Sequence, residues 1–253
     1  MHLLRLEGIE KHFGKIQALR GVDLDLNHGE ALGIVGDNGA GKSTLLKIMS
    51  GVVMPDHGRI FLDGKDVHFR TPKDARARGI EMVYQDLSLC ETLTVAQNVF
   101  LGREPVRRLL GVPLLDKKAL YDKTQRVLEE LRIKIPSIRA QVKNLSGGQR
   151  QAVAIGRAVT FKPKILILDE PTAALAVREV QKVLDLINNL KSHNIATILI
   201  SHRLQDVMTV TDRVVVMYEG KKVAERKTRD LKLEELINLI SQSKSAVRGD
   251  GSE

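Results

Sequence analysis

Cysteine and aromatic residues are scarce in this chain, and tryptophan is absent. A single cysteine, Cys90, excludes an intrachain disulfide and a metal site built from cysteines, and it suits a reducing cytoplasm. Aromatic residues make up only 3% of the sequence. That scarcity argues against a stacking platform for single-stranded nucleic acid.

Long apolar segments are also missing. No run approaches the ~18 apolar residues of a membrane span, and residues 1–20 carry no apolar region of a signal peptide. We therefore expect any role at a membrane to come through a partner. The net charge of +9 suits an acidic partner, such as nucleic acid or an anionic membrane, and equally a basic surface that only maintains solubility.

A phosphate-binding loop is the clearest motif. Residues 36–43 read Gly-Asp-Asn-Gly-Ala-Gly-Lys-Ser, with an apolar strand candidate before them and a helix candidate after them. The backbone N–H groups of such a loop and the helix N-terminus form a nest for a triphosphate. We expect Lys42 to reach the β- and γ-phosphates and the Ser43 hydroxyl to bind Mg²⁺. The residues expected to contact the nucleotide here are Gly36, Asp37, Asn38, Gly39, Ala40, Gly41, Lys42, Ser43 and Thr44.

Two carboxylates follow a buried strand. The apolar run at 164–168 predicts a strand covered on both faces of a parallel sheet, and it ends in Asp169 and Glu170. Beside a phosphate loop this is the Walker B arrangement, in which Asp169 would hold Mg²⁺ through its water shell. Glu170 is placed to accept a proton from an attacking water.

Three further residues are candidates for the same site. Gln85 and His202 follow the predicted strands 80–84 and 195–200, and polar residues at that end of an α/β sheet lie on the ligand side. By itself Gln85 is more readily an ordinary loop residue, whereas the shared edge favours a functional role for His202. Phe13 lies between predicted antiparallel strands within residues 3–26, and packing is favoured over base stacking there.

A helical block interrupts the α/β pattern between residues 86 and 161. Helices are predicted from Thr94 to Leu101 and from Asp116 onward, joined by a Pro- and Arg-containing connection at 103–115. The block ends in Leu145-Ser-Gly-Gly-Gln149 and a helix, which is either a second anion-binding arrangement or a helix start capped by Ser146. A closing hairpin at 213–225, an amphipathic helix at 231–240 and a disordered polar tail complete the predicted elements.

Taken together, these motifs resemble the ATP-binding subunit of an ATP-binding-cassette (ABC) transporter, in the family's order from Phe13 to about Ile240. Residues 145–149 are identical to the family signature. The resemblance implies a single α/β domain over residues 1–241, with a tail at 242–253. It implies a P-loop NTPase core of mostly parallel sheet, an N-terminal antiparallel β part and a helical subdomain inserted at approximately 86–161. It also implies an ATPase in which Phe13 stacks on adenine, Gln85 joins the Mg²⁺ and water network, His202 contacts the γ-phosphate and Glu170 is the general base.

The resemblance further implies partners. ATP would lie between the phosphate loop of one chain and the signature of a second copy, arranged head to tail; the signature residues are Ser146, Gly147, Gly148 and Gln149. An integral-membrane permease would dock near residues 86–103, and a periplasmic or extracellular substrate-binding protein would act indirectly. The chain is thus expected to be peripheral at the cytoplasmic face of the cell (inner) membrane, with no nucleic acid bound.

The phrases at 36–42, 84–89 and 94–102 look like monosaccharide importers of the ribose, xylose and fructose type. Many of those ATPases carry two cassettes in tandem, whereas one is present here, so it would pair with a copy of itself. Ala176 stands where the family usually has Asp, which predicts weaker coupling between the two sites. The alternative is an ABC ATPase acting on nucleic acid or the ribosome, but the long coiled coil or the charged linker between two cassettes that is typical of that class is missing. A P-loop kinase would need an acceptor site and would not need the signature.

Overall fold

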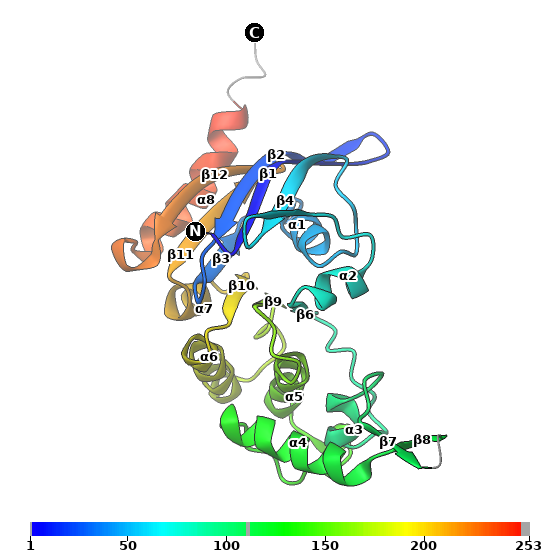
Figure 1. Ribbon diagram of the computed structural model, residues 1–253. Coiled ribbons are helices and arrows are strands. Elements are labelled where there is room, and N and C mark those ends of the chain that lie inside the picture. The colour runs from blue at the N-terminus through cyan, green and yellow to red at the C-terminus, as the bar shows by residue number, and fades with distance from the viewer. Residues whose placement is uncertain (1, 110–111, 249–253) are drawn as a thin grey trace.

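A six-stranded, mostly parallel sheet forms the centre of the computed structural model, which describes residues 2–109 and 112–248 (Figure 1). The strand order is β12-β11-β3-β10-β9-β6, and only β12 runs antiparallel to its neighbour. The strands are β3 (Ala31–Val35), β6 (Ile80–Val83), β9 (Ile165–Asp169), β10 (Ala196–Ile200), β11 (Arg213–Tyr218) and β12 (Lys221–Lys227). All residues of β3 and β10 are buried, as continuous apolar runs in a parallel sheet require.

A second, antiparallel sheet of order β2-β1-β4-β5 covers one side of this core. It is formed by β1 (Leu4–Phe13), β2 (Ile16–Leu26), β4 (His57–Leu62) and β5 (Lys65–Val67), and Asp63-Gly64 makes the predicted turn between the last two. The helix α1 (Lys42–Met49) packs in the same hydrophobic cluster as both sheets. The alternating residues expected to face the core, from Leu4 and Leu6 to Leu24 and Leu26, are buried.

Helices cover the other side of the parallel sheet. The helices α5 (Gly147–Val159), α6 (Val177–Ser192) and α7 (Leu204–Val210) share one hydrophobic cluster with that face, and α8 (Leu233–Arg248) packs beside β11. The short α2 (Pro72–Ala77) lies next to β6 and is capped by Thr71 in a capping box with Asp74, as the Thr-Pro start predicts. None of the helices within residues 2–109 and 112–248 is long and apolar enough to cross a membrane.

The helical block has a hydrophobic cluster of its own. It comprises α3 (Val95–Val99), α4 (Lys117–Glu130), a 3₁₀ turn at Val142–Asn144 and the middle of α5. Thr94 and Asp116 cap α3 and α4 with their side chains, as predicted. The buried Asn98 side chain hydrogen-bonds the backbone N–H and carbonyl of Cys90, which fixes the chain entering the block.

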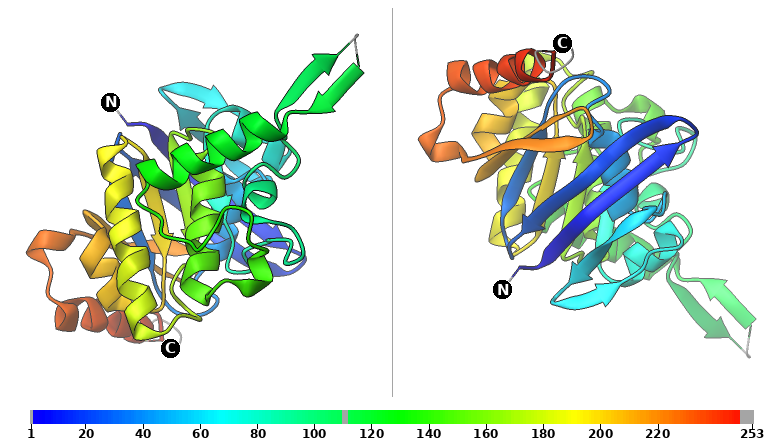
Figure 2. Two further views of the ribbon diagram at one scale, coloured as in Figure 1. Left: turned by 90° about the horizontal axis from the view of Figure 1, so that it is seen from below. Right: turned by 90° about the horizontal axis from the view of Figure 1, so that it is seen from above.

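Two segments differ from the sequence-based expectation. The predicted connection at 103–115 contains a β-hairpin, β7 (Val106–Leu109) and β8 (Val112–Leu115), that projects from the block (Figure 2). Pro113 is tolerated there because a two-stranded hairpin has only edge strands. The helix α8 continues to Arg248, past its expected end at Ile240, because no glycine or proline precedes Gly249. The predicted disorder of residues 242–253 is therefore wrong up to Arg248, and residues 249–253 lie outside the described residues.

One half-buried arginine ties the two sheets together. The Arg213 guanidinium donates hydrogen bonds to Glu30 (2.7 Å) and to the Asp25 carbonyl (2.7 Å), and it pairs with Glu225. Burial lowers the pKa of Arg213, but the hydrogen bonds to Glu30 and Glu225 outweigh it and raise the pKa above its ordinary value. The N-terminal sheet is thus fixed to the start of β3 and to the β11–β12 hairpin.

Candidate functional site

The predicted phosphate loop connects β3 to α1, and packing dictates its glycines. Gly36 and Gly41 have φ angles of 145° and 96°, which strain any other L-residue. A Cβ on Gly36 would lie 2.1 Å from the Met217 carbonyl oxygen, and one on Gly41 would lie 2.6 Å from that of Ala18. The loop pattern therefore follows from the close approach of β2 and β11 to this turn.

Lys42 lies inside the loop. Its Nζ donates to the carbonyl oxygens of Gly36 (2.7 Å) and Asp37 (2.8 Å), and the side chain is buried. Burial lowers the pKa of Lys42, while the carboxylates of Glu170, Asp37 and Asp169 oppose that shift. An ammonium group placed beside the first turn of a helix makes the loop a strong attractor for an anion.

The other loop residues surround this ammonium group. Asn38, Gly39 and Ser43 are exposed, so their polar groups are open to a ligand, whereas Ala40 is buried. Ser43 and Thr44 belong to the first turn of α1, where backbone N–H groups have no partner within the helix.

The strand register brings the carboxylates to the same edge of the sheet as the loop. Ile200 at the end of β10 pairs with Ile34 of β3 on one side and with Asp169 of β9 on the other. Burial raises the pKa of Asp169. Glu170 follows with φ of 50°, a left-handed conformation that costs an L-residue about 1–2 kcal/mol. Such strain is concentrated at functional sites.

Glu170 is held so that one carboxylate oxygen stays available. The His202 backbone N–H donates to Oε2 (3.1 Å), and the His202 Nε2 lies 3.2 Å from Oε1. That second contact is not aligned as a hydrogen bond, so the buried Oε1 has no hydrogen-bond partner among the described residues. Burial raises the pKa of Glu170, against the opposing effects of the His202 N–H group and ring. A buried carboxylate with one free oxygen can accept a proton from water.

Gln85 and Phe13 flank this edge. Gln85 is exposed and comes two residues after Val83, which pairs with Leu168 of β9. Phe13 ends β1, and 48% of its surface is exposed, so the core does not account for it. Ala18 and Leu19 of the following strand touch the phosphate loop at Gly41, which brings the β1–β2 hairpin alongside the loop.

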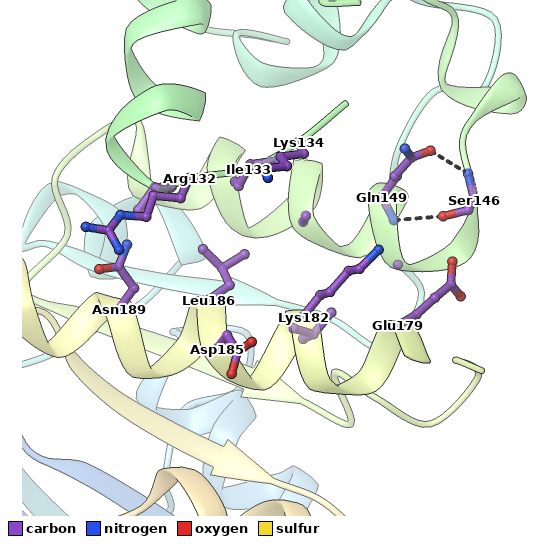
Figure 3. Close-up of a pocket in the computed structure, with 14 residues that line it drawn as sticks. Arg132, Ile133, Lys134, Ser146, Gln149, Glu179, Lys182, Asp185, Leu186 and Asn189 are labelled. Atoms are coloured by element: carbon purple, nitrogen blue, oxygen red, sulfur yellow. Dashed lines mark hydrogen bonds between the residues drawn. The ribbon is translucent and has the colours of Figure 1, made fainter. Parts of the chain in front are cut away.

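The predicted signature lies elsewhere, at the start of α5. Ser146 caps this helix in a capping box with Gln149, with Oγ accepting from the Gln149 N–H (3.3 Å) and Gln149 Oε1 accepting from the Ser146 N–H (3.0 Å). A cavity of about 710 Å³ beside it is lined by α5, α6 and residues 131–134 and by no residue of the phosphate loop (Figure 3). Lys42, Asp169 and Glu170 therefore meet in one place and Ser146–Gln149 in another.

One residue at the signature was not predicted from the sequence. The Glu179 side chain of α6 lies against Gly148, where an added Cβ would be 2.8 Å from the Glu179 Cβ and 3.2 Å from its carboxyl carbon. Hydrogen bonding to the Ser146 hydroxyl and the Gly148 N–H lowers the pKa of Glu179. The backbone N–H groups of the signature at the start of α5, here called the second nest, thus face a carboxylate of the same chain. No spacing pattern reveals this contact, because Glu179 lies 31 positions after Gly148 in the sequence.

A second unforeseen contact joins the segment after Gln85 to the signature helix. The Arg157 guanidinium of α5 donates to the backbone carbonyls of Ser88 (2.8 Å) and Leu87 (2.9 Å). The segment that follows the sheet edge is thereby fastened to the helix that begins at the signature.

A metal ion at the sheet edge would need the nucleotide as well as the protein. Within the described residues, no group of three or more His, Cys, Asp or Glu side chains could hold a metal by itself. The predicted ligands Ser43, Gln85 and Asp169 offer oxygen donors, which suit Mg²⁺ bound together with phosphates. The residues present therefore fit this ion.

Comparison of the sequence with known proteins agrees with the predicted resemblance to ABC ATPases. The sequence profile described as "ABC transporter" matches residues 19–173. The chain is 44% identical over 239 residues to the xylose/arabinose import ATP-binding protein XylG of Sulfolobus acidocaldarius, with 94% of each chain covered. It is 41% identical to the fructose import ATP-binding protein FrcA of Rhizobium meliloti, covering 97% of this chain and 96% of that one. It matches the ribose import ATP-binding protein RbsA 1 of Rubrobacter xylanophilus at 41% identity, but spans only 46% of that relative.

Solved structures agree in fold. The ADP conformation of MJ1267, an ATP-binding cassette of an ABC transporter, superposes with a TM-score of 0.82 at 31% identity, and both chains are covered completely. A dimeric post-hydrolysis state of the cassette MJ0796 bound to ADP and Pi gives a TM-score of 0.74 at 26% identity, over 89% of this chain and 99% of that one. The predicted P-loop NTPase fold is confirmed, and the chain belongs to the ABC transporter family as one of its ATPases.

Proposed function

We propose that this chain is the ATP-hydrolysing subunit of an importer and that it powers uptake of a monosaccharide through a membrane permease. The observation that carries the proposal is identity of 41–44% over nearly the full length of two relatives, one named for xylose/arabinose import and one for fructose import. Both relatives contain little beyond the length of this chain. The two relatives named for sugar import are thus cassettes of about this length.

ATP binds at the sheet edge in this proposal. Lys42 and the N–H groups of residues 36–44 hold the triphosphate, and the exposed Phe13 ring stacks on adenine. Ser43, Asp169 and Gln85 would hold Mg²⁺. When bound, this ion neutralises charge on the β- and γ-phosphates.

Glu170 is the proposed general base. Its free Oε1 accepts a proton from water as that water attacks the γ-phosphorus, and the bond from the γ-phosphorus to the ADP oxygen breaks. His202 has two parts in this step: its backbone N–H holds Oε2 in place, and its exposed ring contacts the γ-phosphate. The raised pKa of Glu170 brings its basicity closer to what proton transfer near neutral pH requires.

The complete site needs a second copy of the chain. Ser146–Gln149 lie apart from Lys42 within one chain, so their donors can serve a nucleotide held by a partner in a head-to-tail homodimer. The dimeric cassette bound to ADP and Pi supports this arrangement. Without those donors, the charge on the transferred phosphoryl group would be under-stabilised.

Closure of the dimer would reach the permease through the helical block. The permease docks near residues 86–103, and the Arg157 hydrogen bonds couple the segment after Gln85 to the signature helix. A substrate-binding protein outside the cell delivers the sugar to the permease. The ATPase is thereby held at the cytoplasmic face of the cell membrane by its partner.

Reconstitution tests this proposal. The chain is assembled with its candidate permease and binding protein in proteoliposomes, and ATP hydrolysis is measured with a panel of pentoses and hexoses. We expect one sugar or a few related sugars to stimulate hydrolysis. Stimulation by RNA in the absence of a permease, or co-purification with ribosomes, would instead support the alternative of a nucleic-acid-associated ATPase.

A further inference from the structure

The hairpin β7–β8 carries an unusual concentration of exposed apolar surface. Val106 and Val112 are 64% and 56% exposed, and Leu114 and Leu115 are also exposed. The hairpin extends away from the helical block into solvent in all three views (Figures 1 and 2). An isolated two-stranded hairpin is at best marginally stable in water, so this one gains from an apolar partner.

Both faces of the hairpin are apolar, and each also carries a cation. Residues paired across an antiparallel hairpin share a face, and the pairs are Val106 with Leu115, Arg107 with Leu114 and Arg108 with Pro113. One face therefore holds Val106, Leu115 and Arg108, and the other holds Val112, Leu114 and Arg107. Neither arginine makes an ion pair with any residue that the structure describes.

The base of the hairpin is fixed to the body. Arg103 donates to Glu81 (2.7 Å), and its guanidinium lies 4.0 Å from the centre of the Phe161 ring. The Asp116 N–H donates to the Pro105 carbonyl (2.8 Å) and closes the hairpin base. The apolar end is thus presented in a set direction.

We propose that β7–β8 inserts into the interfacial layer of an anionic membrane. A flat protein surface would cover one face of the hairpin, whereas a lipid headgroup layer surrounds both. Strands of four residues are about 13 Å long, comparable with the ~5–10 Å to which interfacial segments are buried. The unpaired backbone groups on the hairpin edges require water, which keeps the hairpin in this layer and out of the hydrocarbon core.

The two arginines of the hairpin favour an anionic membrane over a neutral one. Each arginine near an anionic surface strengthens partitioning about fivefold, so Arg107 and Arg108 together contribute about 25-fold. This membrane contact would add to the proposed attachment through a permease. The inference depends on one part of the proposed function, the location of the chain at a membrane. It would orient the chain on the bilayer independently of the sugar transported.

The absence of tryptophan permits a direct test. The variants Val106→Trp and Leu114→Trp each place a single fluorescent reporter on one face of the hairpin, and Val223→Trp places one on exposed β12 as a control. The purified chain is mixed with vesicles of phosphatidylcholine alone or with phosphatidylglycerol added, without permease or nucleotide. We expect a blue shift for both hairpin reporters, but not for the control, and only with the anionic vesicles.

Removal of charge completes the test. In each hairpin reporter variant, Arg107→Gln with Arg108→Gln should weaken vesicle binding by about 25-fold, while Lys221→Gln with Lys227→Gln on β12 should leave it nearly unchanged. ATPase activity of the isolated chain should be the same in all variants, which verifies that they fold. A shift on one face only, no shift with anionic vesicles, or binding that requires embedded permease would overturn the inference. Any of these results would leave the proposed import function intact, because the assay contains no transport step.

Discussion

Two helices, α1 and α5, begin at glycine-containing turns that present backbone N–H groups. The two turns differ in the charged side chain that lies beside them. At α1 the turn encloses the Lys42 ammonium, 2.7–2.8 Å from two loop carbonyls. At α5 the turn faces the Glu179 carboxylate instead. The first nest is ready to bind an anion from solution. The second holds an anionic group of its own chain, which a γ-phosphate would have to displace in the proposed homodimer.

The strongest test of this contrast removes the cation from the first nest. Lys42→Ala should lower nucleotide binding and ATP turnover by about 100-fold or more, because the loop keeps its amides but loses its buried charge. Isothermal titration with ATP and a steady-state ATPase assay measure the two effects. Lys47→Ala, an exposed lysine on the same helix, should remain close to wild type. Full activity of Lys42→Ala would contradict the assignment of the loop.

The next test keeps the first nest intact and stops the chemistry beside it. Glu170→Gln should bind ATP, hydrolyse it about 100-fold or more slowly, and accumulate as a closed dimer, because the amide cannot accept the proton. Light scattering with ATP detects the dimer. Normal turnover would show that Glu170 is not the base.

The pH dependence of wild-type ATPase activity is a second test of Glu170 as the general base. Because burial raises the pKa of Glu170, activity should be lost as pH falls through a value above the ordinary ~4.3 of glutamate. The ionised form is the one disfavoured in the fold, so Glu170→Gln should stabilise the protein above that raised pKa and lose this advantage below it. Melting temperatures at neutral and acidic pH measure the difference.

A smaller effect is expected when the second nest loses its carboxylate. In a Glu170→Gln background, Glu179→Gln should lower the ATP concentration for half-maximal dimer formation by about tenfold, equivalent to about 1.4 kcal/mol. Asp185→Asn removes a charge from the same helix and the same cavity, and should change it little. Equal shifts in both variants would show that the effect comes from the loss of one negative charge and not from the position of Glu179 beside Gly148. Weaker dimer formation by Glu179→Gln would mean that the carboxylate supports the nest.

The smallest change concerns the segment that carries Glu179. Ala176 caps α6 without a side-chain hydrogen bond, whereas Ala176→Asp could accept from the Glu179 N–H and stabilise the protein by about 1 kcal/mol. It should also raise the cooperativity of ATP hydrolysis, measured from the ATP dependence of the rate. Ala173→Asp in the same loop is the control. If Ala176→Asp left rate and cooperativity unchanged, the predicted weak coupling between sites would be wrong.

Short-range signals made much of this molecule predictable. The glycines around Lys42, the caps at Thr94, Asp116 and Ser146, and the buried run before Asp169 each specify a local structure through neighbours in the sequence. The parallel register then brings the strand ends together, so the sheet-edge part of the candidate site follows from the same signals.

Contacts between distant segments were not predictable. The opposition of Glu179 and Gly148 depends on how α6 packs beside α5, and the Arg157 contact depends on how α5 meets residues 87–88. The β7–β8 hairpin was not predicted because its arginines and Pro113 interrupt the alternation of apolar and polar residues that identifies strands.

The Arg213 cluster has a mechanical consequence. Because it fastens the N-terminal sheet to the parallel core, the β1–β2 hairpin that carries Phe13 is held against the sheet from which the Lys42 loop extends. In the proposed function, we therefore expect bending during a turnover cycle where the chain enters and leaves the helical block. The helical block would then move relative to the two sheets, while the part of the chain proposed to hold ATP keeps its arrangement.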